Sequence, residues 1–392
     1  MKKILSLLFL AILMNCQNKK KTDESQLVLF NLTNFPAIGN VQLSDLGFYD
    51  IKYIPLETTE ESMIQHINNL IFGKDYFLIH FFTKIYMFRS DGSFAGKIGT
   101  EGRGPNEFTV VHDIDIENES QNIYLADGWQ EKFFVYSESG DYIRSFRTPI
   151  YSAIDFECTV NGILCYNMNQ FSDVQYSYNL IDTNGSIIKN YSNKYQWNKI
   201  QQNTAIFNEN LFYKFNNKLY KKEVYSDTVF VFENLEFHPH FVIKHGEKLL
   251  TTTARSAQEP SFLFENYINQ SNLFEFGDYV YYEFMYGFKV GANNILRGLI
   301  GSKGNDFQVL INAEKGIIND LDGGPNIWPK KNKDDNTIIS WIDAIQLKKH
   351  VASDAFKNST PRYPEKKKEL EKLAAGLKET DNPVLVLVRL KK

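Results

Sequence analysis

The sequence predicts an all-β fold, a six-bladed β-propeller with a short helical insertion in its last blade. Three observations predict it. Most of the chain reads as short strands rich in aromatic and β-branched residues, these strands repeat with a period in the forties, and a strongly apolar strand stands at the C-terminus. About 350 residues at this period, less the helices, allow roughly six blades of four strands each.

The chain begins with a segment that has the build of a bacterial lipoprotein signal. Two lysines form a basic start, an apolar run follows from Ile4 to Met14, and the run ends just before Cys16. This order predicts a signal peptide over residues 1–15, cleaved before a cysteine that receives lipid. The apolar run is too short to remain as a membrane span. An ordinary secretory peptide with a chance cysteine is the alternative.

The residues after Cys16 predict a destination and a tether. Gln17 stands where an Asp would alter sorting, which favours an outer-membrane lipoprotein of the cell envelope and leaves the periplasmic and the surface face both open. Residues 17–26 contain no apolar residue. We therefore expect a lipidated flexible tether over residues 16–40, contact with the membrane through the lipid on Cys16, and no other cofactor.

Composition narrows the class of partner. The formal net charge is −4 and no part of the chain is strongly basic, so we expect no nucleic-acid partner. Aromatic residues make up 15% of the chain, with 31 Phe and 22 Tyr, and these residue types suit pleated, half-buried surfaces. No second apolar stretch of about 18 residues appears, so residues 41–392 are predicted to form the propeller body.

The early strands are aromatic or β-branched, are bounded by turns and are expected at residues 67–79, 84–88, 94–98, 113–116, 122–126 and 132–136. Three strand–turn–strand units carry Gly92, Gly140 and Gly185, which are 48 and 45 residues apart. A solenoid β-helix needs a much shorter period, so this spacing favours propeller blades.

The C-terminal part departs from the strand pattern and then returns to it. Apolar residues spaced by three or four from Ile339 to Leu347, and a second helix that begins at Pro364, predict a helical insertion at about 338–379. A closing strand is predicted at 383–391. Its expected partner is Tyr49–Leu56, because a propeller hides its edges by pairing an N-terminal strand with the C-terminal strands in one blade.

The link between the first predicted blades resembles that of NHL-type propellers. It runs from Ile98 to Phe108, and the segment Ile123 to Tyr136 looks like the strand–turn–strand unit that follows it. More closely, the chain over about 40–392 is similar to the six-bladed β-propeller lipoproteins of Bacteroidetes-type bacteria, in the stretches 54–60, 227–230, 319–325 and 382–388. The resemblance implies the fold and no particular activity.

The glycines of this link, Gly99, Gly102 and Gly104, are expected to let the chain swing from one blade to the next, with Phe108 wedged between blades. The alternative, a phosphate-binding loop, requires a helix after it, and the sequence after Phe108 reads as strand.

Cys158 and Cys165 flank Asn161-Gly162, the strongest short hairpin signal. With those two residues as the turn, the cysteines lie directly opposite each other. A disulfide and a pair of buried free thiols are both open, because such a register places the cysteines at a hydrogen-bonded position that suits a disulfide poorly.

Few residues point to chemistry. His238 and His240 share one side of a strand with His245 nearby, so a metal site is one interpretation and an ordinary blade strand the other. Asp320 and Asp322 offer two carboxylates in a loop, either a calcium site or a turn. Exposed aromatic residues that stack on a sugar or peptide, or aromatic residues packed between blades, are the two interpretations of Trp129 and Trp328.

No catalytic motif is visible, and the sequence assigns no set of metal ligands. The function predicted is therefore a binding or scaffold module of the cell envelope, with an envelope protein or a glycan or peptide ligand as its partner. The alternative is a metal-dependent lyase or hydrolase with its site at the central channel, since some NHL-type propellers are lyases of that kind.

Overall fold

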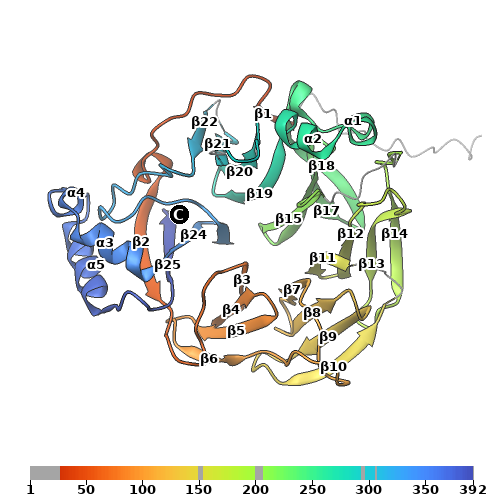
Figure 1. Cartoon of the computed structure of the whole chain (residues 1–392), viewed down its shortest axis with the longest axis horizontal. Coiled ribbons are helices and arrows are strands. Elements are labelled where there is room, and N and C mark those ends of the chain that lie inside the picture. The colour runs from red at the N-terminus through yellow and green to blue at the C-terminus, as the bar shows by residue number, and fades with distance from the viewer. Residues whose placement is uncertain (1–26, 149–152, 199–205, 293–295, 305–306, 392) are drawn as a thin grey trace, which may run out of the picture.

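The computed structural model describes residues 27–391, except 149–152, 199–205, 293–295 and 305–306. Six sheets stand around one axis, so the predicted six-bladed β-propeller is confirmed (Figure 1). Each blade contains a four-stranded antiparallel sheet whose innermost strand lines the centre of the ring.

The first three blades are formed by consecutive strands. Blade 1 contains β3 (Asn69–Phe72), β4 (Tyr76–Phe81), β5 (Lys84–Arg89) and β6 (Phe94–Lys97). Blade 2 contains β7 (Asp113–Ile116), β8 (Ile123–Asp127), β9 (Lys132–Tyr136) and β10 (Tyr142–Arg147). Blade 3 contains β11 (Ala153–Thr159), β12 (Gly162–Asn167), β13 (Tyr176–Ile181) and β14 (Ile187–Ser192).

The other three blades complete the ring. Blade 4 contains β15 (Asn210–Phe215), β16 (Lys218–Glu223), β17 (Thr228–Glu233) and β18 (Glu236–Lys244). Blade 5 contains β19 (Asn269–Phe276), β20 (Tyr279–Met285), β21 (Leu296–Ser302) and β22 (Gln308–Asn312). Blade 6 contains β23 (Lys331–Asp334), β24 (Thr337–Ile342), β25 (Val384–Leu390) and, on its outside, β2 (Phe48–Pro55).

Blade 6 closes the ring as the sequence predicts. The N-terminal strand β2 pairs antiparallel with the C-terminal strand β25, from Phe48 opposite Leu390 to Pro55 opposite Val384. Every side chain of β25 except that of Arg389 is buried, which explains the strongly apolar sequence. A central strand of a blade is covered on both of its faces, so apolar residues are favoured at successive positions.

The folded body begins earlier than expected, which shortens the predicted tether over residues 16–40. Strand β1 (Val28–Asn31) pairs parallel with β18 on the outside of blade 4. Ile38 then bridges to Leu310 of blade 5, before the chain reaches β2. The physical reason is the apolar content of β1, where Phe30 is buried. Residues 28–56 therefore form an N-terminal strap around blades 4, 5 and 6.

Helices occur in two connections of the ring. Short helices α1 (Thr252–Ala257) and α2 (Pro260–Asn266) stand between β18 and β19, and α3 (Ala344–Ala352), α4 (Asp354–Lys357) and α5 (Pro364–Gly376) stand between β24 and β25. Two 3-10 turns, η2 (Ser44–Leu46) and η3 (Gly246–Lys248), complete the set within the described residues. None of the helices in the described part of the chain is long and apolar enough to cross a membrane.

The predicted start of the helical insertion, at about residue 338, is wrong. Residues 337–342 form β24, and the first helix begins only at Ala344. Strand β24 lies between β23 and β25, and its first four residues are buried. A strand buried on both faces lacks the alternation of a half-buried strand, so its apolar spacing resembles that of a helix. The second helix, from Pro364, is confirmed.

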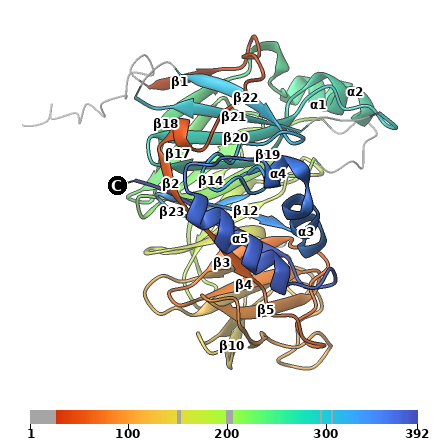
Figure 2. The ribbon, with the colours of Figure 1, turned by 90° about the vertical axis from the view of Figure 1, so that its left-hand side faces the viewer.

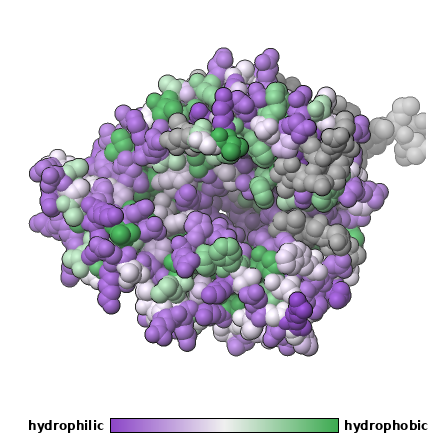
Figure 3. Space-filling model, viewed as in Figure 1, coloured by the Kyte–Doolittle hydropathy of each residue, from purple (hydrophilic) through white to green (hydrophobic). Residues whose placement is uncertain are grey.

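The two faces of the ring differ. On one face, the tight-turn face, consecutive strands are joined by two to six residues, as at 160–161, 216–217 and 335–336. Within the ring, from β2 onward, every connection longer than six residues lies on the opposite face, the long-loop face, and these include all five α-helices. Figures 1 and 3 look onto this long-loop face, and α1 to α4 stand on its side, to the right in Figure 2.

Candidate functional site

The centre of the ring is lined by the innermost strands β3, β7, β11, β15, β19 and β23 (Figure 1). Figure 3 shows a hollow at the centre of the long-loop face. Charged side chains gather there on β7 of blade 2, β11 of blade 3 and β15 of blade 4. They form two layers, which we name by their depth below the long-loop face.

The deep layer consists of Asp115, Glu157 and Lys214. The Lys214 ammonium lies 2.7 Å from Oδ2 of Asp115 and 2.7 Å from Oε2 of Glu157. The backbone N–H of Cys158 also donates to Asp115 Oδ2, at 2.7 Å. Three neighbouring blades are therefore joined by one cation held between two carboxylates.

The outer layer consists of Asp113, Asp155 and Asn210, which stand at or near the ends of their strands closer to the long-loop face. The Phe156 N–H donates to Asp113 Oδ2 at 2.9 Å, and the Asn210 amide donates to Asp155 Oδ2 at 3.2 Å. Among the described residues, no lysine, arginine or histidine forms an ion pair with either carboxyl group. The outer layer differs from the deep layer in this respect.

The pKa values of these carboxyl groups reflect the difference. Burial raises the pKa of Asp155 to about 7, and burial together with the nearby Asp155 raises the pKa of Asp113 well above its ordinary value. In the deep layer, burial raises the pKa of Glu157 to about 7, whereas at Asp115 burial is outweighed by Lys214, which lowers the pKa. Titratable groups perturbed in this way mark a candidate functional site.

The opposite wall of the channel is formed by amides and a lysine. The Lys331 ammonium lies 3.5 Å from Oδ1 of Asn69. The amide of Asn332 donates to the carbonyl oxygen of Lys214 at 2.9 Å, and that of Asn272 to the carbonyl oxygen of Lys330 at 2.7 Å. The channel therefore offers carboxyl groups on one side and neutral or cationic donors on the other.

Sequence reasoning missed these channel residues, although a signal was present. Asp113 and Asp115 alternate with apolar residues along one predicted strand, and Asp155 and Glu157 do the same 42 residues later. That offset is close to one blade, so the same two strand positions carry acid in consecutive blades. Only the ring geometry brings Lys214 between them.

Of the residues singled out from sequence, Trp129 is strongly exposed, at 77%. It stands in the β8–β9 turn on the long-loop face, where its ring meets that of His112 edge-on at 6.0 Å. Trp328 is instead partly buried in the largest core cluster, with its ring 6.1 Å from that of Tyr281.

Asp320 and Asp322 each hold separate segments of the chain together through hydrogen bonds, and they do not face a common ion site. Asp320 accepts hydrogen bonds from Ser44, at 3.1 Å from its N–H and 2.5 Å from its hydroxyl, and pairs with Arg362 at 3.0 Å. Asp322 is buried and accepts hydrogen bonds from the Asn319 amide at 2.6 Å and the Tyr53 hydroxyl at 3.3 Å. These contacts hold the N-terminal strap and the segment before α5 to blade 6.

The three clustered histidines are not brought together. His240 lies 2.9 Å from Glu275, while His245 lies 2.6 Å from Asp227 and 3.2 Å from the Tyr282 hydroxyl. Burial lowers the pKa of His245 to about 4. Within the described residues, no group of three or more His, Cys, Asp or Glu side chains is arranged to hold a metal ion.

The predicted register of the cysteine hairpin is wrong. Cys158 stands opposite Ile163 and Cys165 opposite Phe156, because the turn consists of residues 160–161 and Gly162 belongs to the strand. A Cβ at Gly162 would lie 2.2 Å from the carbonyl oxygen of Ile181, so this glycine is needed for close approach of the next strand. The cysteines are buried free thiols, not a disulfide.

The space within the glycine link after blade 1, residues 98–108, is occupied by the side chain of its own Glu107. Glu107 accepts a hydrogen bond from the Gly104 N–H at 2.7 Å, and a Cβ at Gly102 would collide with its carboxylate. Phe108 is buried between blades, with its ring 6.3 Å from that of Phe134, as expected. Strand β7 follows, so no helix N-terminus stands ready for a phosphate.

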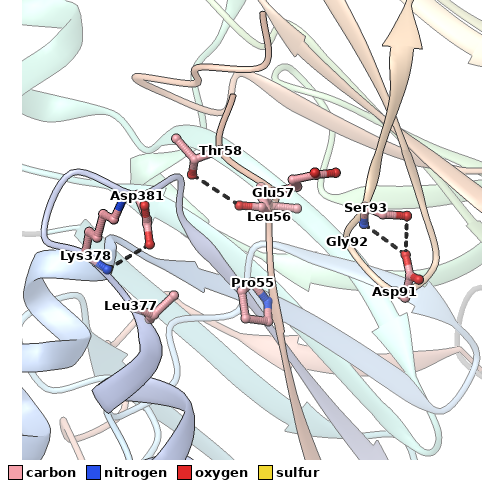
Figure 4. A pocket seen from close by; sticks show the side chains of 10 residues that line it. All are labelled: Pro55, Leu56, Glu57, Thr58, Asp91, Gly92, Ser93, Leu377, Lys378 and Asp381. Atoms are coloured by element: carbon pink, nitrogen blue, oxygen red, sulfur yellow. Dashed lines mark hydrogen bonds between the residues drawn. The ribbon is translucent and has the colours of Figure 1, made fainter. Parts of the chain in front are cut away.

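An open pocket of about 510 Å³ lies outside the channel, where blades 6 and 1 meet (Figure 4). Its polar side chains serve their own turns: Asp91 accepts from the Ser93 N–H at 2.9 Å, and Asp381 from the Lys378 N–H at 2.8 Å. We therefore regard the channel and the long-loop face as the candidate site.

Comparison with known proteins places the chain in a family without an assigned activity. The family described as "Domain of unknown function (DUF4934)" matches residues 29–389. The protein belongs to this family. No curated protein matches it.

Solved structures were also compared with this chain. A Bacteroides fragilis NCTC 9343 protein that is named an exported protein is 17% identical, with a TM-score of 0.71 over 93% of this chain and all of its own. A member of the DUF4221 family from Bacteroides vulgatus ATCC 8482 is 12% identical, with a TM-score of 0.48 over 68% of this chain and 87% of its own. Virginiamycin B lyase from Staphylococcus aureus is 9% identical, with a TM-score of 0.40 over 74% and 95%. The first supports the fold alone, and we base no argument on the other two.

Proposed function

We propose that this protein is a lipoprotein of the cell envelope that binds a ligand or a partner protein on its long-loop face, above the central channel. Loops positioned by a rigid scaffold are the usual place for binding residues. The observation that carries the proposal is that the long loops, the most exposed aromatic side chains and the outer layer of the channel coincide on this one face.

The envelope location rests on the N-terminal segment. The basic start, the short apolar run and Cys16 favour export and lipid attachment at that cysteine, and Gln17 favours the outer membrane. The similar protein from Bacteroides fragilis is also named as exported. The same proposal takes the blades as NHL-like repeats of Bacteroidetes-type lipoproteins, on the strength of the link from Ile98 to Phe108.

A Cys16→Ala variant tests the anchor. We expect it to move from the membrane to the soluble fraction of cells, while the parent chain stays with the membrane. A variant that still sediments with the membrane contradicts lipid attachment at Cys16. The binding half of the proposal is independent of this result.

Photo-crosslinking tests the binding face. A benzophenone amino acid is placed at Trp129 on the long-loop face and, as the matched control, at Val160, which is strongly exposed on the tight-turn face. We expect adducts in living cells from position 129 and none from position 160. Equal adducts from both positions, or adducts from position 160 alone, contradict a binding role for the long-loop face.

A second candidate is a hydrolase or lyase that acts on a glycan or peptide in the channel. It is favoured by the separation of pKa values within the deep layer, where Glu157 has a pKa of about 7 beside Asp115, whose pKa is lowered. Two carboxyl groups separated in this way suit an acid and a base. Release of new ends from cell-wall glycan or peptide, lost in a Glu157→Gln variant, is the result that would favour it.

A further inference from the structure

The most exposed aromatic side chains of the described residues all stand on the long-loop face. Phe82, Trp129 and Phe207 are exposed at 70%, 77% and 74%. They come from the β4–β5 turn of blade 1, the β8–β9 turn of blade 2 and the loop that enters blade 4. We name these three residues the aromatic rim. Large apolar side chains exposed to water on one face are typical of contact surfaces.

The aromatic rim and the acidic side of the channel come from overlapping parts of the ring. The outer layer comes from β7, β11 and β15, which belong to blades 2, 3 and 4, and the rim spans blades 1, 2 and the entry to 4. The lysine-bearing strand β23 belongs to blade 6, across the ring. The exposed aromatic groups and the carboxyl groups therefore come from the part of the ring formed by blades 1 to 4, which we call the acidic sector.

The charge of that sector indicates what kind of group a partner would place there. In the deep layer, Lys214 already balances Asp115 and Glu157 at 2.7 Å. In the outer layer, Asp113 and Asp155 lie beside each other and share a side-chain hydrogen bond. The backbone N–H groups of Ile114 and Phe156 donate to Asp113, and the Asn210 amide donates to Asp155. Neither carboxyl group forms an ion pair among the described residues. A cation brought by a partner would supply there what Lys214 supplies one layer below.

We propose that the long-loop face binds a polypeptide that places a lysine or arginine side chain at Asp113 and Asp155 while neighbouring apolar side chains rest on the aromatic rim. This inference rests on the proposed binding function and deepens it by naming the partner's chemistry. An arginine side chain has donors for both carboxyl groups in one plane, and it also stacks on aromatic rings. A neutral glycan would satisfy the rim and leave the carboxyl pair without a counter-charge.

The test uses the full chain, purified in detergent, and two fluorescein-labelled peptides, Phe-Gly-Arg-Gly-Phe amide and the same peptide with citrulline in place of arginine. Citrulline keeps the shape and removes the charge. We expect the arginine peptide to bind at least about tenfold more tightly, as charge-assisted hydrogen bonds at a partly buried site allow. Fluorescence anisotropy measures both affinities.

Three variants show which residues are responsible for the preference for arginine and for binding itself. Asp155→Asn is expected to abolish the preference for arginine and to leave citrulline binding unchanged. Trp129→Ala is expected to weaken both peptides by a similar factor, and Val160→Ala, on the tight-turn face, to weaken neither. Circular dichroism and the melting temperature establish that each variant is folded.

Equal binding of the two peptides, a preference that survives Asp155→Asn, or no binding of either peptide overturns the inference. These outcomes are distinguishable from failure of the proposed function itself. If position 129 still gives crosslinked adducts in cells while the peptides fail, the long-loop face is a binding surface for a partner of different chemistry. If position 129 also gives none, both proposals fall.

Discussion

The tight-turn face and the long-loop face are both formed by connections between the same blade strands, yet these connections are built differently. On the tight-turn face, glycines at Gly92 and Gly185 have φ near +90°, and a Cβ at either would lie within 2.3 Å of a backbone oxygen. On the long-loop face, Gly128 has no such restriction, and its nearest neighbour is the His112 ring at 3.5 Å. The β8–β9 turn at Gly128 is therefore less constrained by its backbone than the turns at Gly92 and Gly185, although other long-loop connections also contain constrained glycines, such as Gly316 with φ +60°.

The channel repeats this difference along its depth. The deep layer is balanced within the chain by Lys214, whereas no cation among the described residues pairs with the outer layer. In the channel, the carboxyl groups that the chain itself balances lie toward the tight-turn face. The carboxyl groups that form no ion pair among the described residues lie toward the long loops, where a partner can reach them. Four predictions can break or sharpen this contrast.

The largest effect is expected at the glycines. Gly92→Ala should lower the free energy of unfolding by about 2 to 4 kcal/mol, from a strained left-handed backbone and a clash with the Pro55 carbonyl oxygen. Gly128→Ala should change it by less than about 0.5 kcal/mol. Urea unfolding of the two variants measures both values. Equal losses would mean that these two turns do not differ in backbone constraint.

The next effect is expected in the deep layer. Lys214→Met leaves Asp115 and Glu157 facing each other without a cation, and should cost about 1 to 3 kcal/mol, less than for a fully buried pair because the Lys214 side chain is 33% exposed. Adding Glu157→Gln should restore part of the loss. A Lys214→Met chain as stable as the parent would contradict a structural role for the deep layer.

The pH dependence of stability distinguishes the outer layer. Asp155 has a raised pKa of about 7 in the folded state, so between about pH 4 and about pH 7 the folded chain binds more protons than the unfolded chain, and this contribution to stability is lost as the pH rises. Its neighbours are Asp113, Glu157 and Asn210. Asp155→Asn should therefore reduce the loss of stability between about pH 5 and about pH 8 by about 1 to 2 kcal/mol.

Urea unfolding at the two pH values measures this difference. Lys222 provides an opposite trend at higher pH, because burial lowers its pKa to about 7. Its contribution makes the parent chain more stable as the pH rises from about 7 to about 10. An Asp155→Asn chain whose stability depends on pH in the same way as that of the parent would contradict the raised pKa of Asp155 in the folded state.

The smallest effect is expected at the aromatic rim. Trp129→Ala should change the free energy of unfolding by less than about 0.5 kcal/mol, because the side chain is largely in solvent. Thermal unfolding of this variant and of Phe82→Ala measures it. A substantial loss at either position would indicate that the rim packs within the ring.

The propeller, the six blades and the closing pair of strands could be predicted because each depends on patterns within one blade or on one long apolar strand. The errors arose where a pattern had two physical causes. Ile338 and Ile339 are apolar because β24 is covered on both faces. The hairpin after Cys158 turns one residue early because Gly162 is needed by its neighbouring strand.

The candidate site could be predicted only in part. The alternating acids of β7 and β11 were visible, but nothing along the chain places Lys214, 57 residues after Glu157, between two carboxylates. Conversely, Asp320 and Asp322 attracted attention as neighbours in sequence, although each holds a separate element in place. Closeness in sequence suggested a shared site for Asp320 and Asp322 that does not exist. Separation in sequence concealed the real cluster of Lys214 with Asp115 and Glu157.

The closing blade also sets an order of events for the chain as it is made. Strand β2 ends at residue 55, and its partner β25 begins only at residue 384, so the first part of the ring must wait for the last to be synthesised. Bringing together segments this far apart is slow, because the entropy of closing the loop is lost before the contacts form. For a chain that we propose is exported, this delay is useful, since an unclosed ring can still be threaded across a membrane.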